Sequence, residues 1–177
     1  VDVLVLIVTS QIEYDSKVQF PTGVPAILVG PQSTPEVSAL DSDQVGGTTA
    51  AVRHLLDAGH RTVHHITGAP GSFFAARRME VWRGLLEEAG RPVPAPLEGD
   101  WTARSGYEAV RRLLERTPPD QLPTAIFAAN DQMALGAYRA LGEAGLRVPH
   151  DVSVVGFDDV EEAADFSPPL TTIAQDW

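Results

Sequence analysis

The chain has 177 residues, of which 44% are hydrophobic and 21% charged, the composition of a folded globular domain rather than of a disordered segment. Its 13 basic and 24 acidic residues give a formal net charge of −11, and so acidic a surface repels the phosphate backbone of DNA. The absence of cysteine excludes disulfides and thiolate chemistry. No stretch approaches membrane-spanning length, and no basic leader precedes the first apolar run. Because the chain starts inside that run without Met, we expect it to be part of a longer protein.

Short apolar runs alternate with helical patterns along the chain. The runs predict strands, of which the first two are expected to be fully buried, at residues 3–8, 26–29, 37–40, 63–66, 125–129, 152–155 and 170–174. Helices are predicted at residues 44–58, 74–89, 103–116 and 131–144. This alternation predicts an α/β fold, a doubly wound parallel sheet with helices on both faces.

The predicted helices carry start and stop signals. Asp43 and Thr102 are suited to cap the N-terminal ends of two helices, since their side-chain oxygens can accept backbone N–H groups. Gly59, Gly90 and Gly145 stand where three helices should end.

Polar or aromatic residues follow several predicted strands, at the edge where open α/β sheets bind ligands. Arg78 follows the glycine-rich loop after residues 63–66, and Trp101 follows a short segment at 97–98. Asn130 and Asp158 come after two further strands, and Gln175, Asp176 and Trp177 end the chain.

This mixture suits a small polyhydroxy ligand. Carboxylate, amide and guanidinium groups form paired hydrogen bonds to hydroxyls, and an indole face covers the C–H side of a sugar ring. The alternative is that Asn130 and Asp131 only cap a helix, and that Asp158 and Asp159 lie in a solvated turn. The repetition at successive strand ends favours a binding pocket.

Other chemistries have weaker support. Adjacent strand residues His64 and His65 should point to opposite faces, so we expect no metal site. The loop 68–72 lacks the Gly-Lys-Ser/Thr ending of a phosphate loop, and no nucleophile elbow is present. We therefore expect neither a cofactor nor an enzymatic activity.

Five motifs, in this order and spacing, resemble the LacI/GalR family of repressors over essentially the whole chain. They are Val-Arg-His-Leu-Leu-Asp-Ala-Gly-His-Arg at 52–61, Gly-Asp-Trp-Thr at 99–102, Ala-Asn-Asp-Gln-Met-Ala-Leu-Gly-Ala at 129–137, Val-Pro-His-Asp-Val-Ser-Val-Val-Gly-Phe-Asp-Asp at 148–159 and Ser-Pro-Pro-Leu-Thr-Thr-Ile-Ala-Gln-Asp at 167–176.

The resemblance implies a two-lobed, periplasmic-binding-protein-like core with an effector bound between the lobes. Residues 1–42 would form part of the N-terminal lobe, residues 43–174 a nearly complete C-terminal lobe, and residues 175–177 the start of the crossover back. The DNA-binding helix-turn-helix head of the family would lie outside this chain. A homodimer would pair two such heads on an operator in the cytoplasm.

Carried over position by position, the resemblance also implies a set of effector-binding residues. Arg78 would grip hydroxyl or carboxylate groups, and Trp101 would pack on the ligand. Together with Phe74, at a position that departs from the family pattern, the candidate effector-binding residues are Phe74, Arg78, Trp101, Asn130, Asp158, Gln175 and Trp177. Two departures make the pocket more apolar than a typical hexose site: Gly30-Pro31 replaces the frequent Asp-Arg, and Phe73-Phe74 replaces small polar residues.

The resulting hypothesis is an effector-sensing domain of a LacI-type regulator, with a sugar or related polyol as ligand. Two alternatives stay open at this point: a periplasmic-type sugar- or solute-binding protein, and an enzyme of the doubly wound class.

Overall fold

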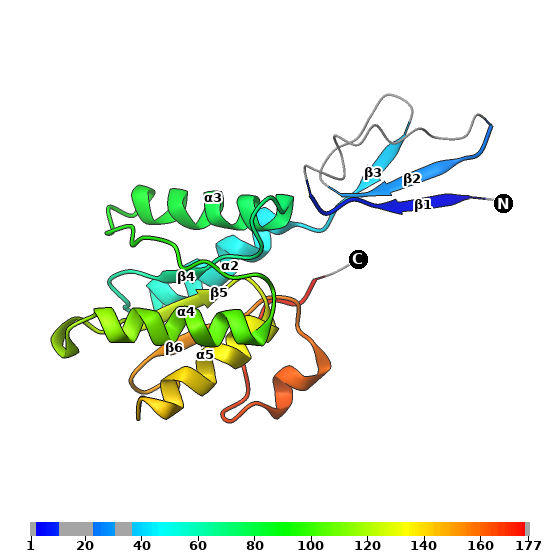
Figure 1. The fold of residues 1–177 in the computed structure, drawn as a ribbon. Coiled ribbons are helices and arrows are strands. Elements are labelled where there is room, and N and C mark those ends of the chain that lie inside the picture. Colours follow the sequence, from blue (N-terminus) through cyan, green and yellow to red (C-terminus); the bar gives the residue numbers. More distant parts are fainter. Residues whose placement is uncertain (1–2, 11–22, 31–36, 176–177) are drawn as a thin grey trace.

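The fold contains two separate three-stranded parallel sheets, seen in a computed structural model that describes residues 3–10, 23–30 and 37–175 (Figure 1). The N-terminal sheet has the order β1 (Leu4–Ile7), β2 (Ala26–Val29), β3 (Ser38–Leu40). The second has the order β4 (His64–Ile66), β5 (Ala125–Ala128), β6 (Ser153–Val155). The predicted α/β class and parallel pairing are confirmed.

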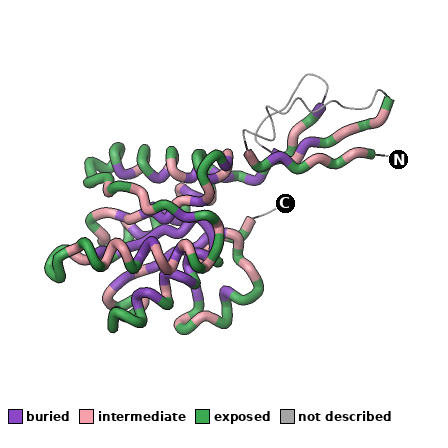
Figure 2. The backbone as a smooth tube through the Cα atoms, viewed as in Figure 1, coloured by how far each residue is buried: buried purple, intermediate pink, exposed green. Residues whose placement is uncertain are grey.

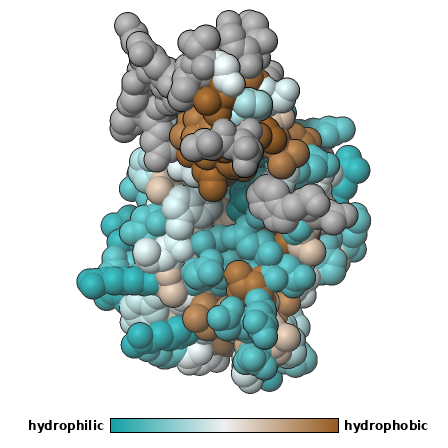
Figure 3. Space-filling view, turned by 90° about the vertical axis from the view of Figure 1, so that its right-hand side faces the viewer, coloured by the Kyte–Doolittle hydropathy of each residue, from teal (hydrophilic) through white to brown (hydrophobic). Residues whose placement is uncertain are grey.

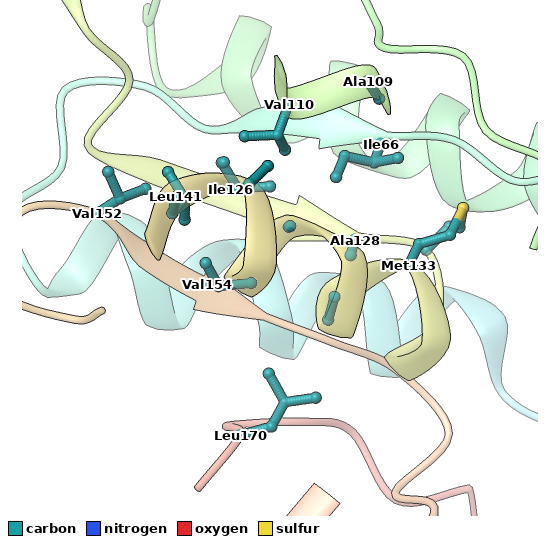
Figure 4. Packing of buried hydrophobic residues seen from close by; sticks show 14 of the residues in the cluster. Ile66, Ala109, Val110, Ile126, Ala128, Met133, Leu141, Val152, Val154 and Leu170 are labelled. Carbon is teal, nitrogen blue, oxygen red and sulfur yellow. The ribbon is translucent and has the colours of Figure 1, made fainter. Parts of the chain in front are cut away.

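Four helices cover the two faces of the second sheet, because its central strand is apolar on both sides. Ile126 and Ala128 of β5 pack with α4 (Ala103–Arg116) and α5 (Asp131–Glu143), in the cluster of Figure 4. Ala125 and Phe127 point the other way, toward α2 (Gln44–Asp57) and α3 (Phe73–Glu88). Short 3-10 turns, η1 (Pro119–Gln121) and η2 (Glu161–Asp165), lie in the connections.

The four α-helices that the structure describes each begin with a side-chain cap. Asp43, Ser72, Thr102 and Asn130 each accept a hydrogen bond from a backbone N–H in the first turn of the helix that follows. Past the ends of α2, α3 and α5, Gly59, Gly90 and Gly145 have φ of 95°, 62° and 75°. A backbone in this left-handed region terminates a helix, as the sequence predicts.

The predicted strand at residues 170–174 is only partly formed. This segment lies parallel to β6, but it pairs through two isolated bridges, Val155 with Thr171 and Asp158 with Ala174. A similar bridge joins Leu97 to Ile66 at the opposite edge of the sheet. Both segments still widen the second sheet beyond its three strands.

The prediction of two fully buried N-terminal strands is wrong. Val5 and Ile7 of β1 are 55% and 65% exposed, Ile27 of β2 is 41% exposed, and Figure 3 shows hydrophobic surface gathered over this sheet. Among the residues that the structure describes, a core covers the opposite face and is formed by Val8, Leu28 and Val37. Figure 2 shows the contrast with the second sheet, where β5 is buried along its whole length and β4 and β6 are buried except at their first residues. A continuous apolar run predicts a strand, but it does not indicate whether one face or both faces of the sheet are covered by other elements.

Among the described residues, no helix is long and apolar enough to cross a membrane.

Candidate functional site

A pocket of about 300 Å³ opens at the carboxyl ends of the second sheet. It is lined by Ser42, Gln44, Phe74, Arg78, Trp101, Asn130, Asp158 and Gln175. Six of the seven residues predicted from the sequence therefore share one cavity, while the seventh, Trp177, lies outside the described residues. Their role as ligand-binding residues stays a prediction.

Arg78 forms the buried centre of this pocket. It lies in the second turn of α3 and is only 4% exposed. Its guanidinium carbon lies 3.6 Å from the centroid of the Phe157 ring, and Nη1 donates to the backbone oxygen of Ala129. Burial lowers the pKa of Arg78 to about 10, so the group remains a cation at neutral pH.

Asp158 is the carboxylate that faces Arg78. Its Oδ1 lies 3.7 Å from Nη2 of Arg78, close enough for attraction but too long for a hydrogen bond. Burial raises the pKa of Asp158, and the nearby guanidinium opposes that shift. A ligand hydroxyl placed beside this pair in the pocket can accept from the guanidinium and donate to the carboxylate.

A second carboxylate, Asp131, holds the loop that carries Asp158. Asp131 is fully buried and accepts hydrogen bonds from the hydroxyl of Thr172 at 2.5 Å and from the backbone N–H of Val160 at 2.9 Å. Asp158 itself has φ of 112°, a backbone conformation that residues with a side chain rarely adopt. Asp131 thus stabilises a strained loop that aims the Asp158 side chain at Arg78.

Trp101 is fixed from two sides. Its φ of 76° is also left-handed, and the Nδ2 of Asn130 donates to its backbone oxygen at 2.9 Å. A methyl group at Gly68 would overlap the indole ring, so only glycine allows the ring this close to the loop after β4. Asn130 both caps α5 and lines the pocket, so its capping role is compatible with a role in binding, which stays a prediction.

Sequence reasoning missed Ser42 and Gln44. Both are buried, and both follow β3 directly, as the predicted site residues follow the later strands. Ligands bind beyond the carboxyl ends of the strands in open α/β sheets, so the residues after the predicted strand at 37–40 could have been included as candidates. An adjoining cavity of about 500 Å³ shares Ser42, Gln44 and Phe74 with the pocket and extends the hollow toward Arg77.

A separate cavity of about 480 Å³ lies between α4 and residues 94–98. Its charged walls are side chains such as Arg112, which is 44% exposed and pairs with Glu108 of the same helix at 3.8 Å. The smaller pocket is the better candidate site, because its polar groups are buried and converge from separate segments of the chain.

No group of three His, Asp or Glu residues gathers as metal ligands in the part of the chain that the structure describes. His64 and His65 point to opposite faces, as predicted. His64 lines the cavity beside α4, whereas His65 stacks on Phe127 with ring centroids 4.7 Å apart.

The two parallel sheets and the strand-end pocket define a ligand-binding α/β core of the periplasmic-binding-protein type. A family model described as "Periplasmic binding protein-like domain" matches residues 52–177. The chain belongs to this family, and within it corresponds to the effector-binding core of LacI-type transcriptional repressors.

The relatives are repressors. The chain is 39% identical over 156 residues to the lactose operon repressor of Escherichia coli, covering 88% of this chain and 42% of that protein. It is 38% identical over 156 residues to the repressor PurR of Haemophilus influenzae, covering 86% of this chain and 45% of that protein. The chain thus spans less than half the length of these relatives.

Solved structures agree with this assignment. The lactose repressor bound to the anti-inducer ONPF is 36% identical, with a TM-score of 0.87, and the match covers 99% of this chain and 65% of that one. The complex of the transcriptional regulator CelR with cellobiose is also 36% identical, with a TM-score of 0.85, covering 99% of this chain and 54% of that one. These comparisons favour a repressor core over the alternatives of a periplasmic solute-binding protein and of an enzyme.

Proposed function

We propose that this chain is the effector-sensing core of a LacI-type transcriptional repressor, without catalytic activity or cofactor. The observation that carries the proposal is the convergence of Arg78, Asp158 and Trp101 on one pocket in a fold shared with these repressors. Residues 1–42 belong to the N-terminal lobe, residues 43–174 form the C-terminal lobe, and residues 175–177 begin the crossover between them.

The effector is a sugar or a related polyol. The facing charges of Arg78 and Asp158 suit adjacent hydroxyl groups, and the aromatic rings of Phe74 and Trp101 suit the apolar face of a sugar ring. The lactose repressor and CelR have been solved with ONPG and with cellobiose, respectively.

The protein acts in the cytoplasm as a homodimer, and it contacts operator DNA through a helix-turn-helix head outside this chain. The acidic chain, with a net charge of −11, is unsuited to bind DNA itself. The effector binds one arrangement of the lobes more tightly than the other. The free energy by which the effector changes operator binding equals the difference between its own binding free energies for the two arrangements.

The test uses the full-length protein. A thermal-shift screen of sugars and nucleosides, starting with cellobiose and ONPG, identifies the effector. Arg78→Ala and Asp158→Ala should raise the effector concentration needed for operator release by about 10- to 100-fold, the effect of losing one charge-assisted hydrogen bond.

Arg83→Ala is the matched control, because Arg83 is an exposed arginine on the same helix as Arg78. It should leave the effector response unchanged. Unaltered operator release in both pocket variants would show that the effector binds elsewhere.

A further inference from the structure

Arg78 and Asp158 face each other directly as an ion pair, and they are also connected by hydrogen bonds through three other side chains. Nε of Arg78 donates to Gln44 Oε1 at 2.7 Å, and Nε2 of Gln44 donates to Ser42 Oγ at 2.6 Å. The Ser42 hydroxyl donates to Gln175 Oε1 at 2.5 Å, and Nε2 of Gln175 donates to Asp158 Oδ1 at 2.6 Å. We call this chain of four hydrogen bonds the relay.

The relay can run in only one direction. A carboxylate accepts hydrogen bonds but does not donate them, so Gln175 must turn its NH₂ toward Asp158 and its carbonyl toward Ser42. The Ser42 hydroxyl then has to donate to Gln175 and to accept from Gln44. At the other end, a guanidinium only donates, which orients the Gln44 carbonyl toward Arg78. Each bond polarises the next, so the four bonds form a cooperative unit.

The middle of the relay lies on the two segments next to the N-terminal sheet. Ser42 belongs to the short link between β3, which ends at Leu40, and α2, which begins at Gln44. Gln175 follows the bridge at Ala174, where the chain leaves the edge of the second sheet in the direction of the N-terminal sheet (Figure 1). The Ser42–Gln175 bond therefore ties these two segments together.

We infer that Ser42 is a positioning residue, which sets the orientation of the N-terminal sheet relative to the second sheet and makes this orientation depend on the state of the Arg78–Asp158 pair. The inference rests on the proposed function for its ligand. A ligand hydroxyl that binds between Arg78 and Asp158 alters both ends of the relay at once. The change then reaches Ser42 through these hydrogen bonds.

The test measures the distance between the sheets without any ligand. The chain contains no cysteine, so two spin labels can be introduced at exposed sites by Ser38→Cys in β3 and Arg104→Cys in α4. Electron–electron double resonance on the full-length protein, with cysteines outside this chain replaced by serine, gives the distribution of label distances.

Ser42→Ala, which breaks the relay at its centre, should broaden or shift this distribution. Ser42→Thr, which keeps the hydroxyl, should restore it. Ser105→Ala is the matched control, since the Ser105 hydroxyl bonds to neighbouring backbone, donating to the backbone oxygen of Thr102 at 2.9 Å and accepting from the backbone N–H of Asp100 at 3.0 Å. An unchanged distribution in Ser42→Ala would overturn the inference. So would equal broadening in the Ala and Thr variants, because the hydroxyl would then not be the cause.

Gln44→Met provides a second break in the relay at nearly constant side-chain volume. It should broaden the distribution as much as Ser42→Ala does, and the double variant should broaden it no further, because both changes interrupt one unit. Additive broadening would contradict a single relay. Since no step requires an effector, failure of this test is separate from failure of the proposed function.

Discussion

At the scale of single residues, His65 is the most unusual buried group in the second sheet. Its imidazole is fully buried, with Trp82 at 5.3 Å and Phe127 at 4.7 Å between ring centroids, and Nδ1 lies 3.0 Å from the backbone oxygen of Phe127. Nε2 has no hydrogen-bond partner among the described residues. Burial lowers the pKa of His65 to about 4, so the folded protein holds this side chain neutral.

We predict a loss of stability in mild acid. The unfolded chain takes up a proton on His65 near pH 6.5 and the folded chain only near pH 4, so between these values the unfolded state binds more protons. The free energy of unfolding should therefore fall as the pH drops from 6.5 to 4, with about 3 kcal/mol of the loss due to His65.

Urea unfolding at a series of pH values, compared between the wild type and His65→Phe, isolates this contribution. The variant keeps a ring between Trp82 and Phe127 but cannot titrate, so its stability should depend less on pH in this window. Parallel pH profiles would show that His65 does not titrate as inferred.

Some residues of the site could be predicted from the sequence and others could not. Arg78, Asn130 and Asp158 could be located because polar groups at strand ends meet at one edge of a parallel sheet. The importance of Gly68 could not be predicted, because it depends on where the Trp101 indole lies in space. The same holds for Asp131, whose partners Thr172 and Val160 are 41 and 29 residues away in the sequence.

At the scale of elements, α4 and α5 pack through glycines at their closest approach. A methyl group at Gly106 would lie 2.7 Å from the Met133 Cα, and one at Gly136 would lie 2.5 Å from the backbone nitrogen of Tyr107. Backbone atoms cannot move aside as a flexible side chain can. This close packing fixes the spacing between the first turns of the two helices, where Trp101 and Asn130 meet.

We predict that Gly136→Ala lowers the free energy of unfolding by about 1–3 kcal/mol, the usual range for overpacking a tight contact. Gly142→Ala is a control in the same helix, since nothing lies within 4 Å of a methyl group there. It should raise the stability by up to about 1 kcal/mol through helix propensity alone. Chemical denaturation measures both changes, and equal effects would show that the two helices separate easily.

The helices were easier to predict than the strands, because caps and terminal glycines mark their ends locally. The predicted helix at 103–116 agrees at both ends with α4, and the one at 44–58 differs from α2 by a single residue. The segment at 170–174 has a strand-like composition, yet only Thr171 and Ala174 pair with β6 and its flank. Whether an edge segment pairs with a strand depends on the strand beside it. The residues of the segment alone therefore do not predict the pairing.

At the scale of the whole molecule, the two sheets differ in how well they are covered. The second sheet has a helical layer on each face, whereas one face of the N-terminal sheet exposes Val3, Val5, Ile7, Ile27 and Leu40. A contiguous apolar surface of this kind promotes association between molecules.

We predict that Ile7→Lys reduces both the binding of the dye ANS and the concentration-dependent association of the 177-residue chain, because it places a charge in the middle of this face. The free energy of unfolding of the second sheet should change by less than about 0.5 kcal/mol. Val93→Lys is the control, because Val93 is also partly exposed, at 37%, but lies outside the sheet. Sedimentation velocity that shows no difference between the two variants would locate the association elsewhere.

Phe74 lines the pocket but takes no part in the relay that joins Arg78 to Asp158. Phe74 therefore contributes to recognition alone, whereas Arg78 and Asp158 serve both recognition and response. An evolving lineage, or an engineer building a biosensor, can exchange Phe74 to admit a new metabolite while the switching machinery stays intact.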